Sequence, residues 1–287
     1  MKYETTEQQT LLEALQCMAP ESSKTTLRSW LRDGRVTVDG QVIKISAFII
    51  KRGQEVALGA RPKFAHEDVR IYYEDKHIVA IEKPTGLLSV ATDFQKEKTA
   101  HAFLKNYYRP GRVFVVHRID QDTSGVMLFA LTEEARDLLK AKFEKHDIER
   151  VYIAIVEGKL PSRKGSWRSR IYEDELYKVH TTDDPHLGQE AITHYEVIDF
   201  TGRYSVLQLT LETGRKNQIR VHCQAAGHPV VGDRKYGASG NPIQRLALHA
   251  HLIAFKHPIT DKYVKFISPV PQVFQKLVSF EVNDATR

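Results

Sequence analysis

Apolar positions in the first part of the chain recur at helical spacing in two short segments. The apolar face of the first segment is formed by Leu11, Leu12 and Leu15. Pro20 ends this segment, and Ser22 or Ser23 can cap a second helix that stops before Gly34. The apolar face of this second helix is formed by Leu27, Trp30 and Leu31. Residues 35–42 then alternate around an Asp-Gly dipeptide, so the pattern predicts two helices followed by a hairpin.

In the remainder of the chain the apolar runs have the length of strands and outnumber the helical segments. Strands are expected at residues 78–81, 113–116, 126–131, 151–156, 193–198 and 205–211. Two helices are expected, one after the cap residue Thr132 and one over residues 217–226. Because no regular β-α-β rhythm is present, the pattern indicates an α+β fold around a mostly antiparallel sheet. We expect two domains, residues 1–62 and residues 68–285, with a linker over residues 59–66.

Basic residues are concentrated near the N-terminal end of the chain. The whole chain carries a net charge of +6, and residues 24–63 alone contain nine basic and three acidic residues. Four of the basic residues recur at spacings of three and four, which predicts a stripe on the second helix: Lys24, Arg28, Arg32 and Arg35. Such runs are commonly solvated surface, but this concentration favours contact with RNA phosphates. A domain used for dimerisation or packing is the alternative.

Membrane proteins and disulfide-rich secreted proteins are disfavoured by the sequence. No apolar run approaches the roughly 18 residues that a membrane-spanning helix needs. The first residues are polar and acidic and lack the apolar segment of a secretory signal. The chain has two cysteines, Cys17 and Cys223, which give no disulfide framework. We therefore expect a cytoplasmic protein that does not contact a membrane.

Thirteen histidines raise the question of a metal site. The candidate groups are His249, His251 and His257, or His222 and His228. No Cys pair or acidic partner stands at ligand spacing beside them, and no Gly-rich phosphate loop is present. The sequence therefore predicts neither a metal ion nor an organic cofactor.

A dense polar loop between two apolar strands is the strongest candidate for chemistry. Residues 117–125 read His-Arg-Ile-Asp-Gln-Asp-Thr-Ser-Gly, and loops held between buried strands are common positions for functional groups. Asp120 or Asp122 alone can also do no more than form a turn. As a pair of carboxylates they can suggest a glycosidase. The positive net charge and the lack of other acids nearby disfavour a carbohydrate cleft.

The loop resembles the signature His-Arg-Leu-Asp-x-x-Thr-Ser-Gly of the RluA-type pseudouridine synthases, with Ile119 in place of Leu. Other segments resemble further segments of that family in the same order: residues 83–90, 150–158, 211–222, 227–233, 236–237 and 245–250. The resemblance spans most of residues 70 to 270. The two helices, hairpin and arginines of the N-terminal part resemble the S-four-type RNA-binding fold.

The resemblance implies an isomerase that converts uridine to pseudouridine in RNA without a cofactor. It implies that Asp120 is the catalytic carboxylate and that Arg220, the Arg of Gln-Ile-Arg, is its ion-pair partner. It also implies that Tyr152 contacts the target base, with a core tyrosine as the alternative. RNA contacts are expected for His117, Arg118, Thr123 and Arg215. Lys216-Asn217 stands where many members carry Thr-His, so a changed local RNA contact is expected there.

The expected partner is RNA. The N-terminal RNA-binding domain favours ribosomal RNA of the large subunit, and transfer RNA is the alternative. We expect the protein to act as a monomer. A non-catalytic RNA-binding or ribosome assembly factor that keeps the synthase fold is the alternative function. The presence of Asp120, Tyr152 and Arg220 together favours the enzyme.

Overall fold

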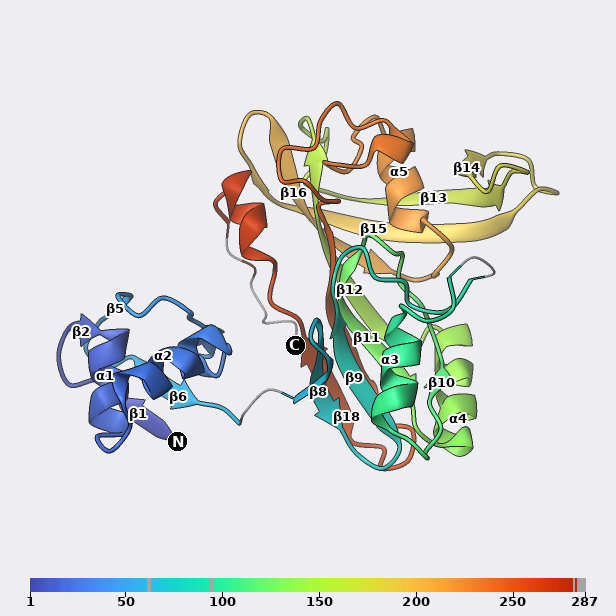
Figure 1. Cartoon of the computed structure of the whole chain (residues 1–287). Coiled ribbons are helices and arrows are strands. Elements are labelled where there is room, and N and C mark those ends of the chain that lie inside the picture. The colour runs from blue at the N-terminus through green and yellow to red at the C-terminus, as the bar shows by residue number, and fades with distance from the viewer. Residues whose placement is uncertain (61–62, 93–94, 281, 283–287) are drawn as a thin grey trace. The chain divides into compact units, whose positions relative to one another are not determined.

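The computed structural model of the chain describes residues 1–60, 63–92, 95–280 and residue 282. The chain divides into two compact units, Met1–Phe64 and Ala65–Arg287 (Figure 1). The predicted domain ends at residues 62 and 285 fall outside the described residues. The linker prediction is wrong at its C-terminal end, because strand β7 occupies Lys63–His66.

The N-terminal unit combines two helices with short strands. Its elements are β1 (Lys2–Glu4), β2 (Gln9–Thr10), α1 (Leu11–Met18), α2 (Lys24–Arg32), β3 (Val36–Val38), β4 (Gln41–Val42), β5 (Ile49–Ile50) and β6 (Glu55–Leu58). Strands β1, β6, β3 and β4 form one sheet in that order, and β2 pairs with β5. The core contains the leucines of both helices and valines of β3 and β6: Leu11, Leu15, Leu27, Leu31, Val36, Val38 and Val56.

Local sequence signals account for the ends of these elements. Thr10 forms a capping box at the start of α1, and the Ser23 side chain accepts a hydrogen bond from the backbone N–H of Thr26 at the start of α2. Asp39 and Gly40, between β3 and β4, have φ angles of 49° and 84°, which a two-residue hairpin turn of type I′ requires. The predicted helices and hairpin are therefore confirmed.

The predicted basic stripe is confirmed for three residues and wrong for the fourth. Lys24, Arg28 and Arg32 lie on α2 and are exposed. Arg35 lies beyond the end of α2, where its Nε donates a hydrogen bond to the carbonyl oxygen of Gly59 at 3.2 Å. Its guanidinium also stands 5.3 Å from the centre of the Trp30 ring. The spacing of three continues past Arg32, but the helix does not, because Gly34 adopts a left-handed φ of 66°.

The second unit is built on one twelve-stranded sheet, which confirms the α+β class. Its strands are β7, β8 (Val69–Glu74), β9 (Ile78–Lys83), β10 (Phe114–Val115), β11 (Ser124–Ala130), β12 (Glu149–Glu157), β13 (Lys164–Glu173), β14 (Val179–Thr182), β15 (Gln189–Phe200), β16 (Tyr204–Leu211), β17 (Leu248–Lys256) and β18 (Tyr263–Ile267). The order is β14-β13-β15-β16-β12-β17-β11-β9-β8-β7, with β10 beside β11 and β18 beside β17. Among the pairings whose register is described, only that of β11 with β17 is parallel.

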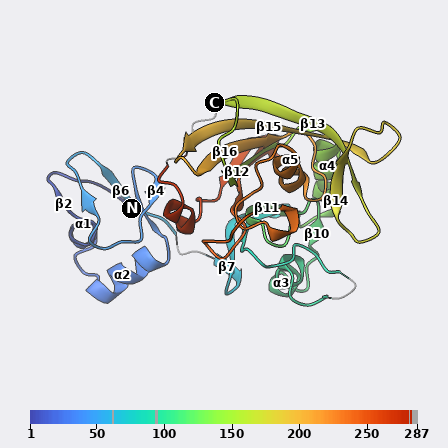
Figure 2. The same ribbon diagram turned by 90° about the horizontal axis from the view of Figure 1, so that it is seen from above.

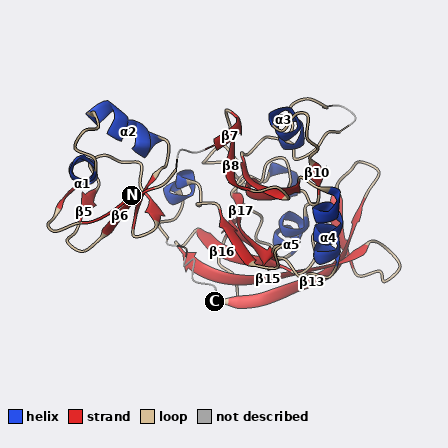
Figure 3. Cartoon of the chain, turned by 90° about the horizontal axis from the view of Figure 1, so that it is seen from below, coloured by secondary structure: helices blue, strands red, loops and turns tan. Residues whose placement is uncertain are grey.

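Helices cover both faces of the sheet near its centre. They are α3 (Ala100–Tyr107), α4 (Glu133–Glu144) and α5 (Gln218–Ala225), with 3-10 turns η1 (Arg234–Tyr236) and η2 (Gln272–Lys276). Met127 and Phe129 of β11 share a core with α3, whereas Val126 and Leu128 pack with α4 on the opposite face. Figures 2 and 3 show α3 and α4 on different sides of the strands. Because both faces are covered, every residue of β11 is buried, as an uninterrupted apolar run predicts.

Several elements have no counterpart in the predictions from the sequence. Strand β13 is mostly polar and only Ile171 in it is buried, so its residues give no clear apolar pattern. Helix α3 contains only two buried residues, Ala100 and Leu104, which is too few for a clear helical period. No helix among the described residues has both the length and the apolar character needed to cross a membrane.

Candidate active site

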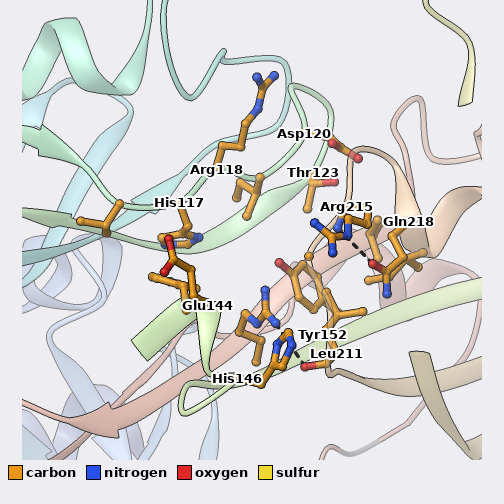
Figure 4. Close-up of a pocket in the computed structure, with 17 residues that line it drawn as sticks. His117, Arg118, Asp120, Thr123, Glu144, His146, Tyr152, Leu211, Arg215 and Gln218 are labelled. Carbon is orange, nitrogen blue, oxygen red and sulfur yellow. Dashed lines mark hydrogen bonds between the residues drawn. The ribbon is translucent and has the colours of Figure 1, made fainter. Parts of the chain in front are cut away.

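A cavity of about 440 Å³ opens where the loop before β11 meets β12 and the segment that leads into α5 (Figure 4). Its lining includes residues 116–120, Thr123, Arg150, Tyr152, and Gly214, Arg215, Gln218 and Ile219. Phe143, Glu144 and His146 at the end of α4 complete one side. Segments that are about one hundred positions apart in the sequence therefore meet at one space.

The polar loop is held in place by the segment that follows β9. The backbone N–H of Gly86 donates to the carbonyl oxygen of Gln121 at 2.9 Å, and the Ser89 hydroxyl donates to the carbonyl oxygen of Ile119 at 2.6 Å. The Lys83 ammonium is fully buried and donates to three carbonyl oxygens, those of Pro84, Leu87 and Gln121. Burial lowers the pKa of Lys83 to about 7, although Asp122 and Asp120 act in the opposite direction. The bonds on either side of Asp120 therefore fix the direction of its backbone.

Asp120 and Arg220 are brought together as predicted, but Asp120 is not the main partner of the arginine. The Nη1 of Arg220 lies 4.0 Å from the Oδ2 of Asp120. Its Nε and Nη2 donate to the two carboxylate oxygens of Asp233 at 2.6 and 2.7 Å, and Asp233 is only 2% exposed. Asp233 thus fixes the guanidinium and leaves one edge toward Asp120. Sequence reasoning missed Asp233, because nothing in its segment indicates which side chain it would meet.

Asn217 links Asp120 to the rest of this network. Its backbone N–H donates to the Asp120 carboxylate. Its side-chain oxygen accepts from Arg220 at 3.2 Å, and its amide nitrogen donates to the Tyr236 hydroxyl at 3.0 Å. Asn217 has a left-handed φ of 53°, which Asn tolerates better than most residues, and it is 7% exposed. The Asn217 side chain is thus engaged inside the protein, and the expected change in an RNA contact at Lys216-Asn217 stays a prediction.

The Asp120 carboxylate experiences opposing influences on its pKa. Burial raises the pKa, whereas Arg220 and the backbone N–H of Asn217 lower it, and the net direction is upward. Its side chain is 22% exposed and lines the cavity. The site therefore presents a carboxylate that is partly stripped of water yet partly compensated by a cation. Such a group can act as a nucleophile or as a base.

Tyr152 extends into the same cavity from β12, and Figure 4 shows it among the lining side chains. It is 9% exposed. Burial raises the pKa of Tyr152 to about 12, although Arg150 lowers it. Its hydroxyl is therefore protonated at neutral pH, and its ring offers a flat apolar surface inside the cavity.

Four further residues predicted to contact RNA line the cavity in different ways. Arg118 and Arg215 are exposed, and the Nε of Arg215 donates to the carbonyl oxygen of Glu190. The hydroxyl oxygen of Thr123 is buried, and among the described residues it has no hydrogen-bond partner. His117 accepts a hydrogen bond at Nε2 from the backbone N–H of Leu128, and burial lowers its pKa to about 3. His117 is therefore neutral and supports the position of the loop.

The histidines considered as metal ligands are engaged in hydrogen bonds instead. The Nδ1 of His249 lies 2.8 Å from the Ser124 hydroxyl, and the Nδ1 of His251 lies 2.8 Å from the carbonyl oxygen of Ser268. Over the residues that the structure describes, no group of three or more His, Cys, Asp or Glu side chains is arranged to hold a metal ion.

Comparison with known proteins identifies the two parts of the chain. A family model described as RNA pseudouridylate synthase matches residues 77–225, and the S4 domain model matches residues 18–56. The chain is 35% identical over 293 residues to the ribosomal large subunit pseudouridine synthase D of Pseudomonas aeruginosa, covering 92% of this chain and 89% of that protein. It is 34% identical over 271 residues to the RNA pseudouridine synthase YhcT of Bacillus subtilis, covering 90% of this chain and 89% of that protein.

A solved structure shares the fold. The human RNA pseudouridylate synthase domain containing protein 1 aligns with a TM-score of 0.58 and 24% identity, covering 73% of this chain and 86% of that chain. Asp120 and Arg220 lie within the residues that the RNA pseudouridylate synthase model matches, and Asp233 follows shortly after them.

Proposed function

Because the chain belongs to the RNA pseudouridylate synthase family, we propose that it modifies uridines of large-subunit ribosomal RNA and uses Asp120 as its catalytic carboxylate. The chain is an isomerase that converts uridine in RNA to pseudouridine. The proposal for Asp120 rests on one observation: its carboxylate lines the cavity while Arg220 and the Asn217 N–H face it. The proposal for the substrate rests on relatives named as large-subunit synthases.

The reaction explains why a compensated carboxylate is useful. The bond between ribose C1′ and uracil N1 breaks, the base turns, and a bond from C1′ to C5 forms. Ionised Asp120 can attack C1′ as a nucleophile or take the neighbouring 2′ proton as a base. Both routes need the negative charge, so Arg220 and the Asn217 N–H support activity by holding the pKa of Asp120 below the value that burial alone would give.

Tyr152 is proposed to stack against the uracil ring and to help remove the C5 proton after the new bond forms. Because its pKa is about 12, the neutral hydroxyl can accept this proton only while it passes its own proton on. In Tyr152→Phe we expect the base to bind normally, whereas loss of the C5 proton slows by about 10²–10⁴-fold. Tritium release from C5-labelled RNA and formation of the C1′–C5 bond should then separate in time. Equal rates in the variant and the parent protein would remove Tyr152 from this step.

The exposed basic residues of α2 are proposed to bind RNA phosphates. Replacing Lys24, Arg28 and Arg32 by Gln together should weaken RNA binding at all sequences alike, because phosphate contacts carry no sequence information. Each lost contact should reduce the slope of log K against log salt by about 0.7–0.9 in magnitude. Filter binding at several salt concentrations measures both effects. Lys262→Gln, an exposed change in the other unit, is the matched control; equal slopes for the triple variant and the control would contradict the proposal.

The choice of RNA is tested directly with RNA from a strain that lacks the gene. Large-subunit ribosomal RNA, small-subunit ribosomal RNA and transfer RNA are labelled at uracil C5 and supplied separately. Release from the first alone supports the proposal, and release from transfer RNA alone would reassign the substrate. We also propose a monomer as the active form. A ribosomal target would place the protein in the cytoplasm.

A further inference from the structure

Arg150 is a buried cation in the cavity, and no carboxylate of the described residues forms an ion pair with it. It is 9% exposed, and it lines the cavity together with Tyr152, two residues further along β12. Its Nη2 donates to the carbonyl oxygens of Leu211 and Glu212 at 3.4 and 2.8 Å. Its Nε is buried and has no partner within the described part of the chain. Arg220, by contrast, is paired with two carboxylates.

Such an arrangement is unfavourable for the empty protein. Burying a charge without a counter-ion costs free energy, which a fold avoids unless a bound molecule supplies the opposite charge. The Arg150 guanidinium is nevertheless held in one place by the two carbonyl oxygens and by the Phe143 ring, 5.7 Å from its centre. Gly214 provides the space for it, because a Cβ at that position would stand 2.4 Å from the Nη1 of Arg150.

We propose that Arg150 binds the uracil ring while the ring carries negative charge, between breakage of the C1′–N1 bond and formation of the C1′–C5 bond. This inference rests on the proposed function. A phosphate of the RNA backbone is the less suitable ligand, because exposed arginines already serve the same cavity at Arg118 and Arg215. Arg150 is instead buried beside Tyr152, where the base would lie.

The charge on uracil follows from the balance of the reaction. The electron pair of the C1′–N1 bond leaves with the base, as an Asp120 oxygen bonds C1′ or as Asp120 takes the 2′ proton and a C1′–C2′ double bond forms. The base then carries one negative charge, spread over N1 and its carbonyl oxygens. When C5 bonds to C1′, Asp120 leaves as a carboxylate or returns its proton to C2′. Finally C5 loses its proton to a base and N1 gains one. A cation beside the ring therefore stabilises the transition state, in which the negative charge develops on the base, more than it stabilises bound neutral uridine.

Two substitutions of Arg150 test this assignment through rate and affinity separately. Enzyme in excess is mixed with total RNA from the deletion strain, labelled at uracil C5, and the single-turnover rate is measured beside the Kd at two salt concentrations. In Arg150→Gln we expect the rate to fall by about 10²–10³-fold, as for loss of one donor to a developing anion, with Kd and its salt slope little changed. Arg150→Lys keeps the charge and should recover part of the rate.

A pair of glycine variants displaces the guanidinium without removing it. Gly214→Ala places a methyl group against Arg150, whereas at Gly240 the nearest contact of a Cβ among the described residues would be the Cδ of Pro242 at 3.9 Å. Neither glycine has a positive φ, so neither substitution places an alanine in the left-handed region. We expect Gly214→Ala to slow the reaction at unchanged Kd and Gly240→Ala to behave as the parent protein.

The outcomes separate this inference from the proposed function. A raised Kd with a smaller salt slope and an unaltered single-turnover rate in Arg150→Gln would show a phosphate contact and overturn the assignment. An unaltered rate in both Arg150→Gln and Gly214→Ala, with Asp120→Asn inactive, would also overturn it while leaving Asp120 in its role. Circular dichroism measures whether each variant is folded. If Arg150→Gln and Gly214→Ala both lose rate only because they lose the folded state, Arg150 is a structural residue and the assignment is overturned.

Discussion

Replacing Asp120 by Asn is expected to slow pseudouridine formation by about 10⁴-fold or more while RNA affinity changes little. The amide of Asn is neither a nucleophile toward C1′ nor a base toward the 2′ proton. It keeps the size of the carboxylate and can still accept the hydrogen bond from the backbone N–H of Asn217. The fold should remain intact, since removal of a partly buried charge relieves a desolvation cost.

Asp122→Asn is the matched control for this experiment. Asp122 lies two positions further along the same loop and is exposed, and its side chain does not line the cavity. Its replacement should reduce the single-turnover rate by less than about tenfold, because it does not touch the reacting atoms. Comparable losses in the two variants would instead indicate a pair of carboxylates acting together. Substantial turnover by Asp120→Asn would remove Asp120 from the chemistry.

Replacing Arg220 by Met is expected to affect stability and activity together. Asp233, which is 2% exposed, would lose both of its hydrogen bonds to the guanidinium. Breaking a buried ion pair by removing one partner costs about 3–5 kcal/mol in the free energy of unfolding. Asp120 would also lose the cation that lowers its pKa, so the acid limb of the pH–rate profile should move to higher pH. Urea unfolding and single-turnover rates between acidic and neutral pH measure these effects.

A double variant distinguishes the two consequences of this change. In Arg220→Met with Asp233→Leu no member of the Arg220–Asp233 pair remains charged, so part of the lost stability should return. The position of the acid limb should not return, because Asp120 still lacks its cation. Recovery of both properties would show that Arg220 serves only to balance Asp233. Undiminished stability in Arg220→Met alone would contradict the importance of the buried pair.

Local patterns in the sequence predict much of the fold for clear physical reasons. Two leucines of each N-terminal helix are spaced four apart, so that they share one face of that helix. All four are buried: Leu11 and Leu15 on α1, and Leu27 and Leu31 on α2. The apolar run before and after the polar loop predicts buried strands, and β11 is covered on both faces. Arg35 shows the limit of spacing as a guide, because the helix ends at Arg32 while the basic period continues.

The residues of the candidate site were likewise predictable only in part. The polar loop and its resemblance to a known signature single out Asp120, and two further segments that resemble the same family single out Tyr152 and Arg220. The structure places these three side chains in or beside one cavity. Their catalytic roles stay predictions. Asp233 and Arg150 could not be found in this way, since their significance depends on which side chain is paired and which is not. Pairing across distant segments is a property of the folded chain and leaves no periodic signal.

We propose above all that Asp120 drives uridine isomerisation in RNA. Its most direct test is tritium release from large-subunit ribosomal RNA labelled at uracil C5 and isolated from a strain that lacks the gene, with the parent protein and Asp120→Asn side by side. We expect release by the parent protein, matched by an equal amount of pseudouridine, and none by Asp120→Asn. Tight RNA binding by both proteins without release from either would contradict it and indicate a protein that binds this RNA without modifying it.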